Sequence, residues 1–148
     1  MSDPVAAIAL FFLGLYAGSL LTEGAVLVPI WRRLPAEDFF RMHKDVGPRL
    51  YRYYAPITIA GVMAPVAFMG LALATGHAPH PLALAAVALC LCALATYFVY
   101  FQRANARFAG RSLSDAELGP ELARWAQVHW ARTVFIVTAF ALLLISQI

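Results

Sequence analysis

The chain has 148 residues, of which 62% are hydrophobic and only 13% are charged, and its mean hydropathy is +0.73. A soluble domain carries roughly 25% charged residues, so this composition argues against a water-soluble globular protein. The formal net charge of +3 would suit a nucleic-acid-binding protein, but the arrangement of the basic residues is better explained by membrane topology. We expect one integral membrane domain over residues 1–148, with the lipid bilayer as its partner and no nucleic acid.

Four apolar stretches are each long enough to cross a bilayer, for which a helix needs about 20 residues. They cover residues 5–31, 53–75, 82–102 and 125–148. Little sequence is left for a soluble part. The predicted fold class is therefore all-α, a four-helix transmembrane bundle.

The loop after the first stretch has the pattern of an amphipathic helix. Glu37 and Asp38 suit the first turn of a helix, and Phe39 and Phe40 are followed by alternating basic and apolar residues. The breaker pair at residues 47–48, Gly-Pro, predicts where this helix ends. We therefore predict a short interfacial helix between the first and second spans.

The loop before the last stretch contains two further local signals. Ser114-x-x-Glu117 has the pattern of a capping box, which marks a helix N-terminus. Gly119-Pro120 is another breaker pair, and proline is favoured at the first position of a helix. The pattern predicts a short helix that stops near residue 119 and a new helix that starts at Pro120.

The basic residues are distributed unevenly between the two ends of the predicted bundle. Ten of the eleven lie in the two loops that follow the first and third spans, and the eleventh is Arg132. The positive-inside rule places both basic loops in the cytoplasm and both termini outside. A bacterial inner membrane is the expected location.

Two charged residues, Glu23 and Arg132, lie within apolar stretches, where a charge costs roughly 2.5–3.5 kcal/mol on insertion scales. Glu23 lies eight residues before Trp31, and Arg132 lies eight residues after Arg124. At the helical rise, both positions are roughly 12 Å inward from the same membrane face. We therefore predict that the two charges lie at similar depth and form one site.

Further polar and aromatic residues lie at the same end of the bundle. Trp125, His129 and Arg132 are spaced so that they share one face of the last helix. Tyr54 near the start of the second span, and Tyr97 and Tyr100 near the end of the third, lie within a few turns of the same surface. These residues predict a polar pocket in the half of the bundle that carries the basic loops.

Several interpretations of this site remain open. Glu23 and Arg132 form a structural ion pair in a non-catalytic membrane subunit, or they line a binding pocket for a lipophilic small molecule. In a metal-binding interpretation, Glu23, His43 and His129 would form a two-histidine, one-carboxylate ligand set that suits non-haem iron or copper. In a haem-binding interpretation, His129 would be the axial ligand. A proton or ion conduit through Glu23 and His129 lacks a polar relay in the outer half. A homo-oligomer would help to close a pocket in so small a bundle.

One segment resembles a known family. Trp125-Ala-Gln-Val-His129-Trp-Ala-Arg132-Thr-Val, followed by an apolar run, resembles the fourth-helix signature of the anthrone oxygenase-like membrane proteins. The stretch from Gly14 through Val28-Pro29 to Leu34-Pro35 is similar to the opening of that family. Length and the four-helix plan also agree with it.

The resemblance implies an activity, the oxidation of a polyketide anthrone to an anthraquinone by O₂ without a metal or organic cofactor. It also implies that His129 is the base that removes a C–H proton, and that Arg132 stabilises the oxygen anion that forms. Glu23 lies outside the matched motif, and two roles are open for it, to orient Arg132 or to bind the substrate. Trp125, Tyr97, Tyr100 and Tyr54 are the aromatic residues expected to contact a flat polycyclic substrate.

Overall fold

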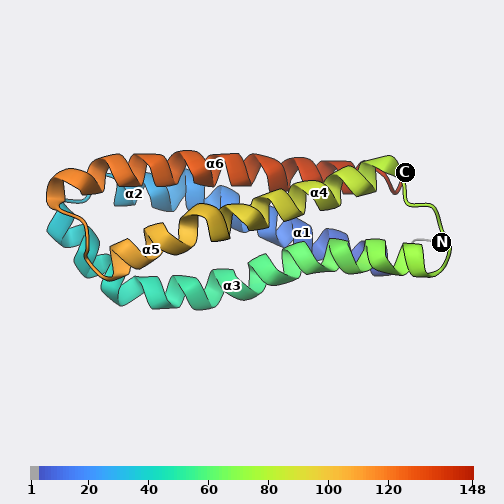
Figure 1. Ribbon diagram of the computed structural model, residues 1–148, viewed down its shortest axis with the longest axis horizontal. Coiled ribbons are helices and arrows are strands. Elements are labelled where there is room, and N and C mark those ends of the chain that lie inside the picture. Colours follow the sequence, from blue (N-terminus) through green and yellow to red (C-terminus); the bar gives the residue numbers. More distant parts are fainter. Residues whose placement is uncertain (1–3) are drawn as a thin grey trace.

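The computed structural model describes residues 4–148 and confirms the all-α four-helix bundle (Figure 1). In chain order, its elements are α1 (Pro4–Thr22), the π-helix η1 (Glu23–Leu27), α2 (Val28–Trp31), α3 (Ala36–Ala74), α4 (Pro81–Thr96), the π-helix η2 (Tyr97–Phe101), α5 (Gln102–Ala109) and α6 (Asp115–Ile145). Within these residues, four helical segments are long and apolar enough to cross a membrane, namely Pro4–Trp31, Ala36–Ala74, Pro81–Ala109 and Asp115–Ile145. The chain is therefore an integral membrane protein. The first three residues of the predicted 1–148 domain lie outside the described part.

The long helices form a ring in which each packs mainly against two others. α1 contacts α3 and α6, and α4 contacts the same two helices from the opposite side. The connections after α2 and α5 lie together at one end of the bundle, and the turn between α3 and α4 lies at the other end with the C-terminus (Figure 1). The two basic segments therefore share one end of the molecule, as their charge pattern predicts.

α3 is one continuous helix of 39 residues, so the predicted break at Gly47-Pro48 and the separate interfacial helix are wrong. A proline inside a helix removes one backbone hydrogen bond and crowds the preceding turn. The N-terminal part of α3 is held in place by packing, since Phe39 lies edge-to-face against Phe108 of α5 with ring centroids 5.3 Å apart. Both phenylalanines are buried, and this tertiary contact outweighs the local preference for a break.

The last helix also begins earlier than predicted. α6 runs through Gly119-Pro120 without a break, so the predicted short helix before Pro120 is wrong. The capping box is confirmed, because Glu117 Oε2 accepts a hydrogen bond of 2.9 Å from the backbone N–H of Ser114. The third span is likewise longer than predicted, since helical structure continues through η2 and α5.

Two apolar clusters fill the interior of the bundle. One occupies the half near the termini and includes Leu13, Tyr16, Val62, Cys90, Ile136 and Leu143. The other occupies the half near the basic loops and includes Phe39, Phe101, Phe108, Leu122 and Trp125. Along α6, His129 and Arg132 are buried between these two clusters, and Glu23 is buried between them along the first span. The polar site thus lies inside the bundle and is enclosed by packed apolar side chains on both sides.

Gly61 allows α1 and α3 to approach each other closely. A Cβ atom at this position would lie 2.6 Å from Cβ of Tyr16, which is itself fully buried. We expect Gly61→Ala to lower the free energy of unfolding by about 1–3 kcal/mol, because the two helices would have to separate. Thermal unfolding in detergent measures this change.

The matched control for Gly61→Ala is Gly70→Ala on the same helix. A Cβ at Gly70 meets no atom within 4 Å. Alanine is a better helix former than glycine by up to about 1 kcal/mol, so the control should be as stable as the wild type or more so. Equal destabilisation by both changes would show that the Tyr16 contact is not the cause.

Candidate functional site

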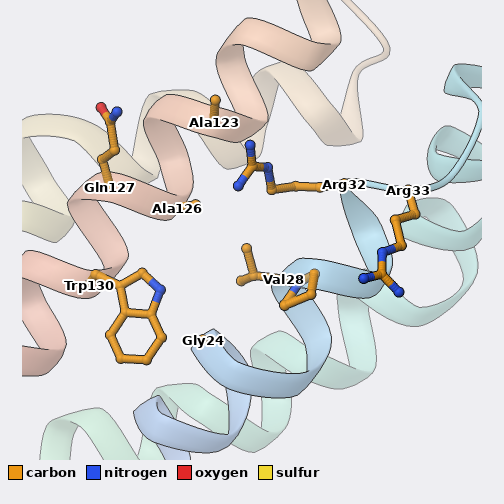
Figure 2. A pocket seen from close by; sticks show the side chains of 9 residues that line it. Gly24, Val28, Arg32, Arg33, Ala123, Ala126, Gln127 and Trp130 are labelled. Atoms are coloured by element: carbon orange, nitrogen blue, oxygen red, sulfur yellow. The ribbon is translucent and has the colours of Figure 1, made fainter.

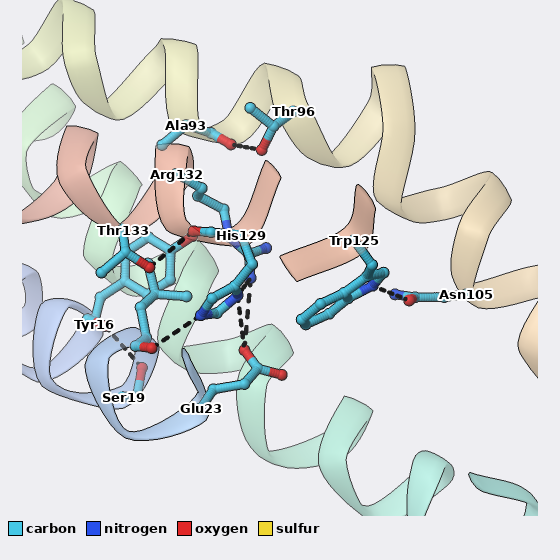
Figure 3. Close-up of polar contacts among 11 residues, drawn as sticks. Tyr16, Ser19, Glu23, Ala93, Thr96, Asn105, Trp125, His129, Arg132 and Thr133 are labelled. Atoms are coloured by element: carbon cyan, nitrogen blue, oxygen red, sulfur yellow. Dashed lines mark hydrogen bonds and ion pairs between the residues drawn. The ribbon is translucent and has the colours of Figure 1, made fainter. Parts of the chain in front are cut away.

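The two charges in the apolar spans lie beside each other, together with a histidine (Figure 3). Glu23 Oε2 is 3.6 Å from Nη2 of Arg132 and 3.5 Å from Nδ1 of His129. The exposed fractions are 6% for Glu23, 9% for Arg132 and 0% for His129. The prediction that Glu23 and Arg132 lie at the same depth is confirmed, and His129 lies within the same cluster.

A π-helix places Glu23 in this cluster. Glu23 is the first residue of η1, in which the chain departs from α-helical hydrogen bonding for five residues. Such π-bulges are rare and frequently occur at functional sites. The second π-helix, η2, borders the same cluster, because the guanidinium carbon of Arg132 lies 4.2 Å from the ring centroid of Phe101 in η2. Sequence reasoning missed both π-helices, since no motif in either segment distinguishes it from an α-helix.

Both ring nitrogens of His129 are engaged in hydrogen bonds. Nε2 lies 3.0 Å from the carbonyl oxygen of Leu20, and Nδ1 lies 3.1 Å from Nη2 of Arg132. A carbonyl can only accept and a guanidinium can only donate. These partners assign the hydrogen to Nε2 and leave the lone pair on Nδ1 directed toward Arg132 and Glu23.

The imidazole of His129 is also fixed by packing. It stacks on Trp125 with ring centroids 5.1 Å apart and planes 8° from parallel. On the opposite helix, a Cβ at Gly24 would lie only 3.0 Å from Nε2, so glycine at this position permits the close approach of η1 to the ring. Trp125 is held in turn, because its Nε1 donates to Oδ1 of Asn105 at 3.0 Å. The orientation of the imidazole is therefore set before any ligand binds.

Arg132 retains unused hydrogen-bonding capacity. Its Nε–H is buried and has no hydrogen-bond partner within residues 4–148. Its contact with Glu23 is 3.6 Å long, which exceeds a normal hydrogen bond. A buried donor without a partner costs about 1–3 kcal/mol, so the guanidinium is well suited to an additional acceptor.

A cavity of about 900 Å³ reaches this cluster from the side of the bundle. It lies between the first half of α3 and the segment formed by η2 and α5. Six of its lining residues are aromatic, namely Trp31, Tyr51, Tyr54, Tyr97, Phe98 and Phe101. Tyr51 and Phe98 are more than half exposed, whereas Glu23 and Arg132 are the buried charged residues among the lining side chains. The cavity therefore has aromatic residues and two exposed basic residues, Lys44 and Arg52, toward its mouth, and the buried Glu23 and Arg132 at its inner end.

The predicted site residues are divided between the cavity and its surroundings. Tyr54 and Tyr97 line the cavity, together with Glu23 and Arg132. Trp125 stacks on His129 behind the cavity wall. Tyr100 points elsewhere, since its hydroxyl donates to Oε1 of Glu121 at 2.9 Å and Arg124 lies over its ring. His129 is likewise behind the wall.

Several cavity residues were not predicted, including Phe98 and Phe101 on η2 and Thr58 on α3. An apolar residue in a spanning helix carries no signal that separates a cavity wall from a lipid contact. The π-helix adds to the difficulty, because it changes which residues of Tyr97–Phe101 face inward.

The residues of the alternative metal-binding interpretation do not come together as a ligand set. His43 lines the cavity but stacks on Phe39, with centroids 5.6 Å apart and planes 17° from parallel. Among residues 4–148, no group of three or more His, Cys, Asp or Glu side chains is placed to hold a metal ion. His43 therefore does not join Glu23 and His129 in a ligand set.

Comparison of the chain with family models, with curated proteins and with solved structures finds no match. The resemblance of the Trp125–Val134 segment to the anthrone oxygenase-like proteins therefore stays a prediction.

Proposed function

We propose that this protein is a small membrane enzyme of the oxygenase type, which oxidises a lipophilic polycyclic aromatic substrate of the anthrone kind with O₂. The observation that carries the proposal is the placement of Glu23 and Arg132 at the inner end of an aromatic-lined cavity. Pockets for small molecules typically measure about 300–1,000 Å³, and the cavity of about 900 Å³ falls in this range. Flat aromatic side chains such as Tyr54 and Tyr97 suit a flat substrate.

The proposed reaction converts one anthrone and one O₂ into one anthraquinone and one water. A base removes a proton from the methylene carbon, and the electron pair of the C–H bond becomes part of an enolate. The enolate carbon bonds to O₂, and the terminal oxygen of the resulting peroxide anion takes up a proton, which gives a hydroperoxide on the substrate. Removal of the second proton from the same carbon forms the ketone as the O–O bond breaks, and the departing hydroxide takes up a proton and leaves as water. Arg132 would stabilise the enolate oxygen anion, which is the charge that develops in the first step.

Geometry favours Glu23 over His129 as the group that accepts the first proton. The Glu23 carboxylate lines the cavity, whereas His129 lies behind its wall with both nitrogens already engaged. Nδ1 of His129 is 3.5 Å from Glu23 Oε2 and accepts a hydrogen bond from Nη2 of Arg132, which holds the guanidinium beside the carboxylate. The proposal therefore keeps His129, Arg132 and Glu23 as the catalytic set and gives the first proton transfer to Glu23. No cofactor is part of the proposed reaction.

A structural lock is the second candidate function, and one observation favours it. The hydrogen bond from His129 to Leu20 and the ion pair from Arg132 to Glu23 join the same two spans, the first and the last. In a non-catalytic membrane subunit, these contacts would serve to hold the spans together. The unused Nε–H of Arg132 and the adjacent cavity are not needed for such a role.

A cavity-filling variant tests the proposed enzyme. Ala55 lines the cavity from α3, and Ala55→Phe would place a ring in the space of the substrate. We expect kcat/KM for anthrone oxidation to fall about 100-fold, since even a small displacement of a bound substrate has an effect of this size. O₂ uptake and anthraquinone absorbance of the purified protein measure the reaction, with one O₂ consumed per anthraquinone formed.

The matched control is Ala67→Phe on the lipid-exposed side of the same helix, outside the cavity, which should keep the wild-type rate. An unaltered rate in Ala55→Phe would remove the cavity from the mechanism. If the wild-type protein did not oxidise anthrone faster than buffer alone, the proposed oxygenase activity would be refuted and the structural lock would be the favoured function.

A further inference from the structure

A groove lies on the other side of η1 from the cavity. It has a volume of about 750 Å³ and lies between the end of the first span and the first half of α6 (Figure 2). The cavity and the groove share no lining residue. They lie on either side of η1, because Glu23 lines the cavity and the next residue, Gly24, lines the groove. The groove is therefore a separate site, and binding of a ligand there is independent of the proposed oxygenase activity.

The floor of the groove is made of small and apolar residues. Gly24 and Val28 come from the first span and Ala123 and Ala126 from α6, and the indole of Trp130 forms one wall (Figure 2). Trp130 is 42% exposed although it lies well inside a predicted membrane span. A groove with this lining suits a hydrocarbon chain lying along the surface of the bundle.

The end of the groove is strongly basic. Arg32 and Arg33 follow α2 directly, and Figure 2 shows the Arg32 side chain extended across the groove toward α6. Both arginines are exposed, and neither forms a salt bridge within the described residues 4–148. The lining residues include no aspartate or glutamate. The guanidinium groups of Arg32, which reaches across the groove, and of Arg33, which points to the other side of α2, have no protein counterion, so this end of the groove provides a site for an anion (Figure 2).

Phosphate is the anion that fits this arrangement. A guanidinium group binds phosphate oxygens through two parallel hydrogen bonds. Arg32 and Arg33 lie next to Trp31, at the end of a membrane span, which is the level of lipid headgroups. A free phosphate ion would leave the apolar floor of the groove uncovered, whereas a phospholipid would fill both parts.

We propose that this groove binds an anionic phospholipid. Its phosphate binds the guanidinium group of Arg32, Arg33 adds positive charge at the same end of the groove, and one acyl chain lies over Gly24 beside Trp130. The side-chain amide of Gln127, which also lines the groove, is available to the headgroup. Basic pockets between spanning helices are known to select anionic headgroups in this way.

The experiment is a lipid titration of the purified full-length protein, followed by native mass spectrometry. Phosphatidylglycerol is compared with phosphatidylcholine of the same acyl chains, and we expect tighter binding of phosphatidylglycerol. Arg32→Gln/Arg33→Gln should weaken phosphatidylglycerol binding roughly 10- to 30-fold and weaken phosphatidylcholine binding less, because the choline cation offsets the charge of its phosphate. The matched control, Arg49→Gln/Arg103→Gln, removes the same charge from exposed positions outside the groove and should leave the affinity unchanged.

A second variant tests the groove without a change in charge. Ala123→Trp would fill it, and we expect weaker binding of phosphatidylglycerol with both arginines present. Unchanged binding in this variant would overturn the groove as the site. If Arg32→Gln/Arg33→Gln and Arg49→Gln/Arg103→Gln weakened phosphatidylglycerol binding equally, the lipid would be held by a general attraction between opposite charges, and the proposal would be overturned. Equal affinity for the two lipids, or complete displacement of phosphatidylglycerol by millimolar inorganic phosphate, would also overturn the proposal.

Discussion

Replacing Arg132 with methionine is expected to lower the free energy of unfolding by about 3–5 kcal/mol, because the change leaves the buried Glu23 carboxylate without its charged partner. Glu23 is 6% exposed, so water compensates little of this loss. Thermal unfolding in detergent measures it, and the protein contains a suitable reporter. Cys90 is fully buried and Cys92 is exposed, so in a Cys92→Ser background a thiol-reactive dye reports exposure of Cys90.

The double variant Glu23→Gln/Arg132→Met completes this test. It removes both charges, and we expect it to recover most of the lost stability, because two neutral groups need no ionic partner. Arg103→Met, at an exposed position, should change stability by less than about 0.5 kcal/mol. If Arg132→Met were as stable as the wild type, Glu23 and Arg132 would not be coupled energetically.

The same double variant separates the two candidate functions. A structural lock needs only a stable contact between the first and last spans, so a stable double variant would retain whatever the protein does. An enzyme that uses these groups would recover its stability and remain inactive.

Glu23→Gln is expected to reduce the rate of anthrone oxidation about 10²- to 10⁴-fold, the usual contribution of a general base. The amide keeps the size and hydrogen-bonding capacity of the side chain but cannot accept the C–H proton. The rate is measured as anthraquinone formation at saturating anthrone and O₂. Because the substitution leaves Arg132 without a buried counterion, folded protein must first be confirmed by gel filtration.

The matched control for Glu23→Gln is Glu121→Gln. The Glu121 side chain is only 14% exposed and pairs with Arg107 at 3.2 Å, but it does not line the cavity. This variant should keep the wild-type rate. If Glu23→Gln stays active while His129→Gln loses activity, the base is His129, as the resemblance to the anthrone oxygenase-like proteins implies. Full activity in both variants would refute a catalytic role for the cluster.

The depth of Glu23 and Arg132 was predictable from sequence because helical rise is nearly constant. Trp31 and Arg124 lie at the same end of the bundle, and an equal count of residues from each reaches the same level. The shared face of Trp125, His129 and Arg132 follows from helical periodicity, and all three are buried. Such inferences hold because they depend only on the local geometry of the helix.

Helix boundaries and the cavity were not predictable in the same way. The Gly47-Pro48 signal is local, but the start of α3 is held by contacts with residues distant in sequence, such as the ion pair of Glu37 with Arg111. The cavity depends on how far α3 lies from η2 and α5. That separation is a property of tertiary packing, and no residue pattern within a single span encodes it.

The π-helices η1 and η2 also affect how this chain compares with its relatives. A π-bulge contains one residue more than the α-helical turn it replaces, which rotates the rest of the helix by about 100°. A relative with an uninterrupted α-helix would therefore match this chain only through a one-residue gap within 23–27 or 97–101. Alignments that forbid gaps inside spanning helices would superimpose lipid-facing positions of one protein on pocket positions of the other.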